Sequence, residues 1–339
     1  MSARTTRTGT NLKSIGEFGL IERLKKFAGG RGGMLAGIGD DAAVLEGREG
    51  YVTLLTTDML TEKVHFLLDK VSPYQLGRKS MACNVSDIAA MGGYPTFAVV
   101  SLGLPANLPV EFVEEFYRGL AEEAGRWGAA IVGGDTVESK GGLVINVALL
   151  GEVETGRQIL RSTARAGDAI YVTNVVGESA AGLTAVLNPG MPLLPRMREY
   201  LIRRHYLPTP RVPEAREIGQ KSWATAMADV SDGIAGDLRR ICEASGVGAL
   251  VYAEKLPVST GVKQVAGFLG KEAYELALIG GEDYELLFTS GAEDLPESLP
   301  ESGTRVTRIG EIRPSGEGLM LALPGGETTP FPAAGYDHF

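Results

Sequence analysis

The residues of this sequence best suited to chemistry are carboxylates that recur beside glycine, serine or threonine. The stretch "GIGDDAAV" (37–44) places Asp40 and Asp41 next to each other after two glycines. Adjacent carboxylates repel each other unless water or a cation separates their charges, and the glycines permit a tight bend or a close approach to a ligand. The pair is therefore either a solvated turn, for which Gly and Asp are ordinary residues, or part of a site that holds a cation.

Five further segments have the same character: "TTDML", "NVSDIAAMGG", "VGGDT", "ADVSDG" and "GGEDYELLF". Each is a weak signal alone, because Asp at the end of a strand usually caps, turns or faces water. Together they place carboxylates at the ends of elements, where ligand sites of α/β proteins tend to lie. The acidic residues concerned are Asp40, Asp41, Asp58, Asp87, Asp135, Asp229, Asp232, Glu282 and Asp283.

Carboxylates with hydroxyl and carbonyl oxygens suit hard divalent cations, and Mg²⁺ in particular binds through a few carboxylates together with substrate phosphates. Zinc is disfavoured. The three histidines, His65, His205 and His338, are far apart in the sequence, and no Cys-x-x-Cys or His-x-x-x-His spacing occurs.

The ordinary phosphate-binding motifs are missing. No Gly-x-x-x-x-Gly-Lys-Ser/Thr segment is present, so a P-loop is excluded. "GIGDDA" fails as a dinucleotide fingerprint because acidic residues fill the turn that should meet pyrophosphate. Protein-kinase signatures and the Gly-x-Ser-x-Gly nucleophile elbow are absent too.

The elements that must position these carboxylates form an α/β pattern in the first half. Strands are predicted at 51–58, 97–104, 129–136 and 143–153, and helices at 17–27, 73–93 and 109–128. The triplet Val-Ser-Asp occurs at 85–87 and at 230–232, and an apolar helical pattern follows it each time. Ser and Asp are common helix N-caps, so each triplet is expected to precede a helix.

A turn-rich, polar passage over 151–168 separates the halves. Beyond it we predict strands at 169–174, 248–253, 284–290 and 304–312, and helices at 177–187, within 195–220 and within 228–246. The second half is therefore α+β or α/β as well, and a length of 339 residues suits two domains.

The composition limits the partners. The net charge of −9 argues against a general binder of nucleic acid or of membrane surfaces, because both are polyanionic. An anionic ligand would need metal ions as adaptors. The two cysteines, the lack of an apolar run of about 18 residues and the polar first residues lead us to expect a cytoplasmic protein.

Eight segments together resemble the thiamine-monophosphate kinase family, part of the superfamily that includes aminoimidazole ribonucleotide synthetase. They are "GEFGLIERL", "GIGDDAAV", "TTDMLTEKVHF", "NVSDIAAMGGYP", "GGDT", "DVSDG", "GGEDYELLFT" and the final "GYDHF". The resemblance implies an α/β (α+β) fold of two domains like that of aminoimidazole ribonucleotide synthetase. Residues 1–150 would bind ATP and Mg²⁺ and form a homodimer, and residues 151–339 would complete the nucleotide and substrate site.

Carried over by motif, the resemblance also implies roles for single residues. The implied metal ligands are Asp41, Thr56, Thr57, Asp58, Asp87, Asp135, Asp229 and Asp232. The implied ATP contacts are Tyr117, Gly134, Asp135, Arg161 and Ser231. The implied substrate contacts are His65, Glu282 and Tyr336, of which the carboxylate and the aromatic ring suit a cationic thiazolium.

The implied activity is transfer of a phosphoryl group from ATP to thiamine monophosphate, with several Mg²⁺ ions. Phosphoryl transfer depends mainly on positioning and charge neutralisation, so clustered aspartates without a P-loop lysine make one consistent design. The acceptor is already an ionised phosphate. We therefore expect direct in-line transfer, with no general base, no covalent catalytic residue and no phosphoenzyme.

Three alternatives remain open. A sister enzyme of the superfamily would activate an amide, a formyl group or selenide, although this chain has neither the N-terminal nor the C-terminal cysteine that two of those branches use. A nucleotide sensor would bind ATP without turnover. A metal-dependent phosphatase would release phosphate from thiamine monophosphate without ATP.

Overall fold

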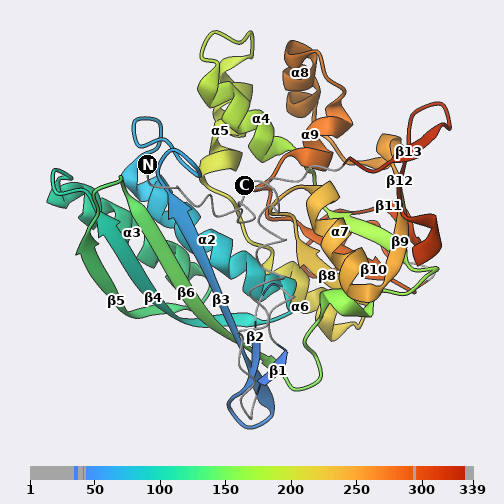
Figure 1. The fold of residues 1–339 in the computed structure, drawn as a ribbon, viewed down its shortest axis with the longest axis horizontal. Helices are drawn as coiled ribbons and strands as arrows, with labels where there is room; N and C mark the ends of the chain where they lie inside the picture. Colours follow the sequence, from blue (N-terminus) through green and yellow to red (C-terminus); the bar gives the residue numbers. More distant parts are fainter. Residues whose placement is uncertain (1–33, 37–40, 42, 293–294, 333–339) are drawn as a thin grey trace, which may run out of the picture.

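The computed structural model describes residues 34–36, 41, 43–292 and 295–332. Two β-sheets lie side by side, one from each half of the chain, and helix α2 lies between the first sheet and the second half (Figure 1). The predicted helix at 17–27 falls outside the described residues.

Within the described residues, the first sheet has six strands in the order β1-β2-β3-β6-β4-β5. Only β4 and β5 are parallel neighbours, so the sheet is mixed. Its strands are β1 (Met34–Ala36), β2 (Ala43–Glu46), β3 (Tyr51–Thr61), β4 (Tyr94–Leu104), β5 (Ala130–Glu138) and β6 (Val144–Glu154).

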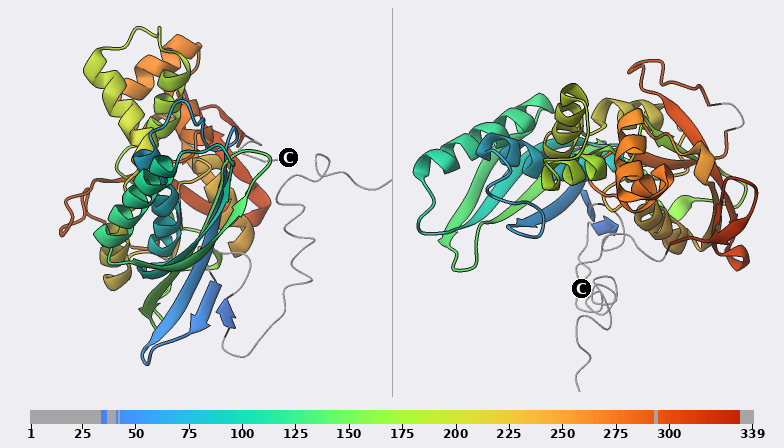
Figure 2. Two further views of the ribbon diagram at one scale, coloured as in Figure 1. Left: turned by 90° about the vertical axis from the view of Figure 1, so that its left-hand side faces the viewer. Right: turned by 90° about the horizontal axis from the view of Figure 1, so that it is seen from above.

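Helices α2 (Pro73–Ala90) and α3 (Val110–Arg126) cover one face of this sheet (Figure 2, left). Residues alternate along β3, so that Val52, Leu54 and Leu60 are buried beneath the helices while Met59 is 58% exposed on the other face. Phe97 and Val99 of β4 also face outward, at 52% and 43% exposure. We call the side of the sheet that carries Leu55, Met59, Phe97, Val99 and Val137 the open face.

Helix α2 is buried around most of its circumference, including polar residues such as Lys79, Ser80 and Asn84. Ser72 and Gln75 form a capping box at its start, next to Pro73. Gly77 allows α2 to touch α3, because a Cβ there would lie 2.0 Å from the Phe116 carbonyl oxygen. Because α2 is enclosed on most sides, its buried polar side chains point into the interior of the protein rather than into solvent.

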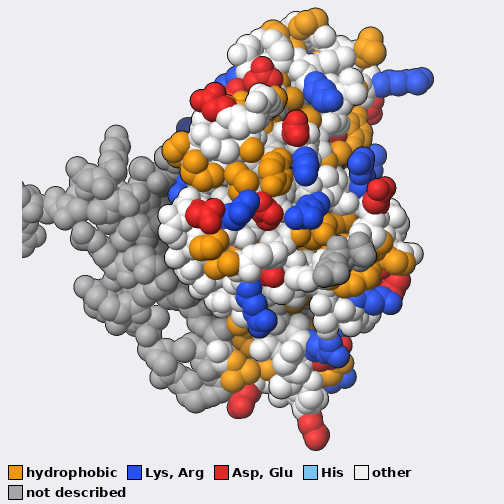
Figure 3. Space-filling model, turned by 90° about the vertical axis from the view of Figure 1, so that its right-hand side faces the viewer, with side chains coloured by type: hydrophobic (Ala, Val, Ile, Leu, Met, Phe, Trp, Pro, Cys, Tyr) orange, Lys and Arg blue, Asp and Glu red, His pale blue; other side chains and the backbone are white. Residues whose placement is uncertain are grey.

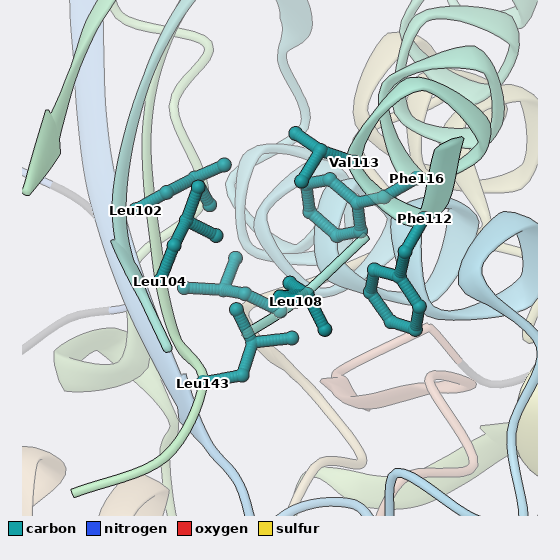
Figure 4. A pocket seen from close by; sticks show the side chains of 8 residues that line it. Leu102, Leu104, Leu108, Phe112, Val113, Phe116 and Leu143 are labelled. Atoms are coloured by element: carbon teal, nitrogen blue, oxygen red, sulfur yellow. The ribbon is translucent and has the colours of Figure 1, made fainter. Parts of the chain in front are cut away.

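An apolar recess lies between α3 and the strands β4 and β6 (Figure 4). Side chains from both layers point into it, and none of those that line it is charged. It is lined by Leu102, Leu104, Leu108, Phe112, Val113, Phe116, Leu143 and Ile145. This lining suits core packing and does not suit a phosphate ligand.

The second sheet has seven strands in the order β13-β12-β9-β11-β7-β10-β8. Strands β7, β8 and β10 are buried on both faces, as the apolar runs of β7 and β10 predict. Strand β8 was not predicted, and 228–229 belong to it rather than to the helix predicted within 228–246. The strands are β7 (Ala169–Thr173), β8 (Ala226–Asp229), β9 (Val247–Tyr252), β10 (Leu286–Ser290), β11 (Val306–Pro314), β12 (Leu319–Ala322) and β13 (Thr328–Pro330).

Helices α7 (Ile234–Ser245) and α9 (Ala273–Ile279) pack on one face of the second sheet, and α6 (Val212–Gln220) lies on the side of α2. A separate helical group consists of α4 (Glu178–Leu187), α5 (Pro195–Tyr206) and α8 (Thr260–Leu269) (Figure 1). Short 3₁₀ turns are η1 (Arg161–Thr163), η2 (Ala253–Lys255) and η3 (Ser315–Glu317).

The predicted fold class is confirmed, with three local corrections. Strand β3 continues to Thr61 rather than ending at Asp58, and Asp135 lies inside β5 rather than at its end. The first Val-Ser-Asp triplet lies near the end of α2, whereas only the second precedes a helix. A side chain can therefore reach a site from inside an element, which strand-end patterns do not show.

The face of the molecule on the right of Figure 1 carries basic and acidic side chains intermixed with apolar ones (Figure 3). No helix among the described residues is long and apolar enough to cross a bilayer.

Candidate functional site

Three carboxylates from distant parts of the chain meet at the junction of the two halves. Asp41 precedes β2, Asp87 lies in the last turn of α2, and Asp229 ends β8. One oxygen of each lies within 4.8 Å of the others. We call Asp41, Asp87 and Asp229 the carboxylate cluster.

Hydroxyl groups hold two members of the carboxylate cluster in place. Thr56 Oγ1 donates to Asp87 Oδ2, and Ser86 Oγ donates to Asp229 Oδ2 at 2.6 Å. The second oxygen of Asp229 is buried and accepts no hydrogen bond from the part of the chain that the structure describes. A buried carboxylate oxygen that accepts no hydrogen bond from the protein is suited to coordinate a cation.

The cluster costs electrostatic energy in the metal-free protein. Burial, followed by the charges of Asp232 and Asp41, raises the pKa of Asp58 to about 6. Burial and neighbouring carboxylates raise the pKa values of Asp87 and Asp229 well above their ordinary range. Such shifts appear when several acids share one buried space, and a bound cation would relieve them.

Two arginines border the cluster. Arg161 pairs with Asp41, and both side chains are nearly buried. Arg240 pairs with Asp232 and lies 2.9 Å from an oxygen of Asp237. Asp237 in turn accepts hydrogen bonds from the backbone amides of Ser231 and Asp232, at 3.0 and 3.1 Å. The turn that carries Ser231 and Asp232 is thereby fixed beside Asp229.

The structure does not bring every predicted site residue to the cluster. Thr57 points to the open face, opposite Asp58, and its hydroxyl donates to the carbonyl of Val147 at 3.0 Å. Gly134 and Asp135 lie on the edge strand β5, three strands from β3, which corresponds to about 14 Å. Asp135 pairs in register with Ser101 and so shares the open face with Thr57.

Tyr117 lies on α3 near the first half of α2. Its neighbour Phe116 touches Gly77, and Asp87 is ten residues further along α2, which corresponds to about 15 Å. Within one chain, Tyr117, Gly134 and Asp135 therefore stand apart from the carboxylate cluster.

The segment "GGEDY" (280–284) lies next to the Ser231 turn. The amides of Glu282 and Tyr284 donate to the carbonyls of Ser231 and Val230, at 2.7 and 2.9 Å. Glu282 forms an ion pair with the buried Lys79 rather than with a surface cation. His65 Nδ1 accepts from the amide of Thr61 at 3.0 Å, so the proton of the neutral ring is on Nε2. Tyr336 lies outside the described residues.

Comparisons with known proteins agree with this architecture. Two family models match in succession: "AIR synthase related protein, N-terminal domain" over 39–153 and "AIR synthase related protein, C-terminal domain" over 165–321. The thiamine-monophosphate kinase of Bacillus subtilis is 35% identical over 327 residues, which cover 95% of this chain and 99% of that protein. The chain belongs to the thiamine-monophosphate kinase family.

Further members of the thiamine-monophosphate kinase family agree. The thiamine-monophosphate kinase of Aquifex aeolicus is 39% identical, over 91% of this chain and 95% of that protein. The solved structure "AaThiL complexed with AMPPCP and TMP" superposes with a TM-score of 0.85 at 37% identity, covering 98% of this chain and all of that one. The resemblance inferred from the sequence motifs is therefore confirmed, as is membership of an enzyme family.

Several residues around the site were missed by sequence reasoning. Ser86 and Asn84 lie in a helix whose interior polar residues look like an ordinary exposed face, yet Asn84 accepts from the amide of Asp58 at 3.1 Å. Asp237 and Arg240 have the spacing of a common surface ion pair. Lys79 and His205 carried no motif. In the sequence Lys79 stands between Arg78 and Ser80, so no local pattern distinguished it.

A cation should stabilise this member of the thiamine-monophosphate kinase family even without nucleotide. Replacing EDTA with excess MgCl₂ relieves repulsion among Asp41, Asp87 and Asp229, which should add about 2–3 kcal/mol to the free energy of unfolding at saturation. Chemical denaturation with and without Mg²⁺ measures this. Asp69→Asn, at an exposed carboxylate, should keep the whole gain; an equal midpoint in EDTA and Mg²⁺ would contradict a cation site.

His205 should make the fold sensitive to acid. Its ring is 3% exposed, and burial, then the charge of Lys79, lowers the pKa of His205 to about 3. The unfolded chain takes up this proton near pH 6.5, whereas the folded chain does not. The free energy of unfolding should thus fall as pH falls from about 6.5 towards 3, by up to about 1.4 kcal/mol per pH unit.

The comparison variant for this pH effect is His205→Gln, measured by urea denaturation at several pH values. The difference in free energy of unfolding between wild type and variant should shrink as the pH falls below about 6.5. A difference that stays constant between neutral and mildly acidic pH would show that the folded protein also binds this proton.

Proposed function

We propose that this chain catalyses ATP-dependent phosphorylation of thiamine monophosphate to thiamine diphosphate, with Mg²⁺ and by direct in-line transfer. The observation that carries the proposal is the meeting of three carboxylates, the buried Asp229 and the partly buried Asp41 and Asp87. It occurs in a chain that aligns almost end to end with "AaThiL complexed with AMPPCP and TMP".

The residues present fit magnesium. The donors are hard oxygen atoms, the cluster is compact, and Asp229 keeps a buried oxygen that accepts from no described protein donor. Asp41, Asp87 and Asp229 would hold the metal, with Thr56, Asp58 and Asp232 around them. When bound, Mg²⁺ neutralises and orients phosphate oxygens that the carboxylates alone would repel.

The nucleotide side of the site would be formed by Arg161 and by the turn at Ser231. Arg161 supplies a fixed positive charge beside Asp41, where phosphate oxygens of ATP would lie. The turn is held rigid by Asp237 and Arg240, so Ser231 is positioned before any ligand binds.

The acceptor side would be formed by Glu282 and His65, together with Tyr336. Glu282 is 26% exposed at its side chain, and its carboxylate suits the cationic thiazolium ring of thiamine monophosphate. The acceptor phosphate is ionised at neutral pH, so the transfer needs no general base and no covalent enzyme intermediate.

A homodimer would complete the site, with 1–150 as the dimerisation and ATP/Mg²⁺ domain and 151–339 completing the site. The open face exposes Met59 of β3 and Phe97 and Val99 of β4, on the two strands that flank β6, which is the pattern of a buried interface. Thr57, Gly134 and Asp135 lie on or beside this face, and Tyr117 lies apart from the cluster. A second copy packed there would bring such residues to the cluster of its partner.

The cytoplasm remains our prediction for the location of this protein. It is supported by the two free, buried cysteines, which form no disulfide.

The deciding experiment incubates the purified protein with ATP, Mg²⁺ and thiamine monophosphate, and follows thiamine diphosphate and ADP together. Equal amounts of both products, lost with EDTA, are expected. Without acceptor, no ADP and no phosphorylated protein should form. ATP binding without thiamine diphosphate would favour a sister reaction or a sensor, and phosphate release without ATP would favour a phosphatase.

A further inference from the structure

The buried lysine of α2 has one described carboxylate partner. Lys79 is 1% exposed, and its Nζ lies 2.8 Å from Glu282 Oε1 and 2.8 Å from Glu282 Oε2. The two residues come from different halves of the chain. A lysine buried this completely needs its ion partner, because an unpaired buried charge is strongly destabilising.

Glu282 has a constrained backbone, and its carboxylate is only partly enclosed. The φ angle of Glu282 is +65°, a backbone conformation that is unfavourable for a residue with a side chain. The preceding Gly281 has no room for a side chain, since a Cβ there would lie 2.3 Å from the Ser231 carbonyl oxygen. The side chain of Glu282 is 26% exposed although its carboxylate pairs with Lys79. A strained conformation of this kind persists only where surrounding contacts fix it.

The other neighbours of Glu282 do not supply a second permanent positive charge. His205 Nδ1 is 3.4 Å from Glu282 Oε2 and 3.0 Å from Ser179 Oγ, and the ring stays neutral at neutral pH. Burial acts to raise the pKa of Glu282, but the charge of Lys79 and its hydrogen bond outweigh it and leave the pKa below its ordinary value.

The remainder of the segment is anchored on the opposite side. Asp283 accepts from the backbone amides of Gly177 and Ser179 at the start of α4, and Glu285 binds Arg204 and Arg211. Asp283 and Glu285 thus attach this segment to α4, to α5 and to the start of α6, while Glu282 and Tyr284 face α2, where the Tyr284 hydroxyl lies 2.9 Å from Cys83 Sγ. Among the described contacts of the segment, the Lys79 ion pair is the one that holds the Glu282 carboxylate to α2.

We propose that Lys79 is a positioning residue for the acceptor: it holds the carboxylate of Glu282 where a cationic ring binds, without itself touching substrate. This inference rests on the proposed function, because it assigns the cationic ring to thiamine monophosphate. In the proposed function the nucleotide binds at Arg161 and Ser231, and this segment meets the Ser231 turn through the backbone amides of Glu282 and Tyr284, so nucleotide binding should not depend on the side-chain pair.

The test compares Lys79→Met, Lys79→Arg and Glu282→Gln in steady-state kinetics with each substrate varied. Lys79→Met should raise KM for thiamine monophosphate about 10- to 100-fold, the range seen when a supporting partner of a binding residue is lost. KM for ATP should stay within about twofold, since uniform loss of acceptor binding raises only the acceptor KM. Lys79→Arg keeps the charge and should recover part of the loss.

The matched control is Arg216→Met, which breaks another ion pair between the two halves, from α6 to Glu154 at 2.6 Å. A structural role alone predicts that Lys79→Met and Arg216→Met lower stability and kcat alike, with no selective change in the acceptor KM. That result would overturn the proposal.

The double variant Lys79→Met/Glu282→Gln keeps the test valid if Lys79→Met does not fold, because it leaves no buried charge unpaired. If Lys79 acts only through Glu282, the acceptor KM of the double variant should equal that of Glu282→Gln. A further increase of about tenfold would mean that Lys79 acts independently, which contradicts the inference. A wild-type protein that binds ATP but gives no thiamine diphosphate would instead refute the proposed function.

Discussion

Asp87→Asn is expected to lower kcat to about one hundredth of wild type or less, because loss of a metal-ligating carboxylate removes at least ~3 kcal/mol of charge stabilisation. The same substitution should stabilise the metal-free protein. Burial, followed by the charges of Asp58, Asp229 and Asp41, raises the pKa of Asp87 well above the ordinary range. An amide keeps the shape and the acceptor for the Thr56 hydroxyl while removing the repulsion.

Steady-state kinetics and chemical denaturation in EDTA measure the two effects together. Asp58→Asn should act in the same direction, since burial, followed by the charges of Asp232 and Asp41, raises the pKa of Asp58 to about 6. Asp69→Asn is the matched control, at an exposed carboxylate outside the site. Near-normal rates in both Asp87→Asn and Asp58→Asn would remove these residues from the metal site.

Val99→Lys is expected to convert the proposed homodimer into an inactive monomer. Val99 lies in the middle of the open face, 43% exposed on β4 between strands β6 and β5. A lysine buried there without a partner should cost several kcal/mol of association energy, which weakens the dimer by about a thousandfold or more. Analytical ultracentrifugation measures the oligomeric state, and an activity assay at the same protein concentration measures the loss of function.

Leu194→Lys is the control for the added charge, because Leu194 is 72% exposed before α5, away from this sheet. It should remain dimeric and active. A Val99→Lys protein that is dimeric with full activity would exclude the open face as the interface.

Mixing inactive variants tests whether the partner supplies Asp135. If each site uses Asp87 of one copy and Asp135 of the other, co-refolded Asp87→Asn and Asp135→Asn should regain about one quarter of wild-type activity, because half of the dimers carry one intact site. No recovery in a dimeric mixture would place both residues in a site within one chain, which the separation across three strands argues against.

Much of the local structure could be predicted because it depends on short-range patterns. The alternation in β3, the capped start of α2 at Ser72 and the apolar runs of β7 and β10 all have signatures within a few residues. The strands β12 and β13 were missed because strands this short form only against their neighbours. Helix α8 was missed although Ser259 caps its start and Gly270 its end, which are signals that the sequence does carry.

The sequence by itself determined the residue types of the site and the ligand class they suit: many carboxylates, no P-loop lysine and no soft metal ligands. A motif consists of residues that are neighbours in the sequence. It can therefore identify Asp87 or Glu282 as a site residue, but it does not show which distant residues contact them. Only the tertiary structure brought Asp41, Asp87 and Asp229 within 4.8 Å, separated Thr57 and Asp135 onto the open face, and joined Lys79 to Glu282. The physical reason is that repulsion, burial and ion pairing depend on distances in space, which residues up to 203 positions apart acquire only when the sheets and α2 pack together.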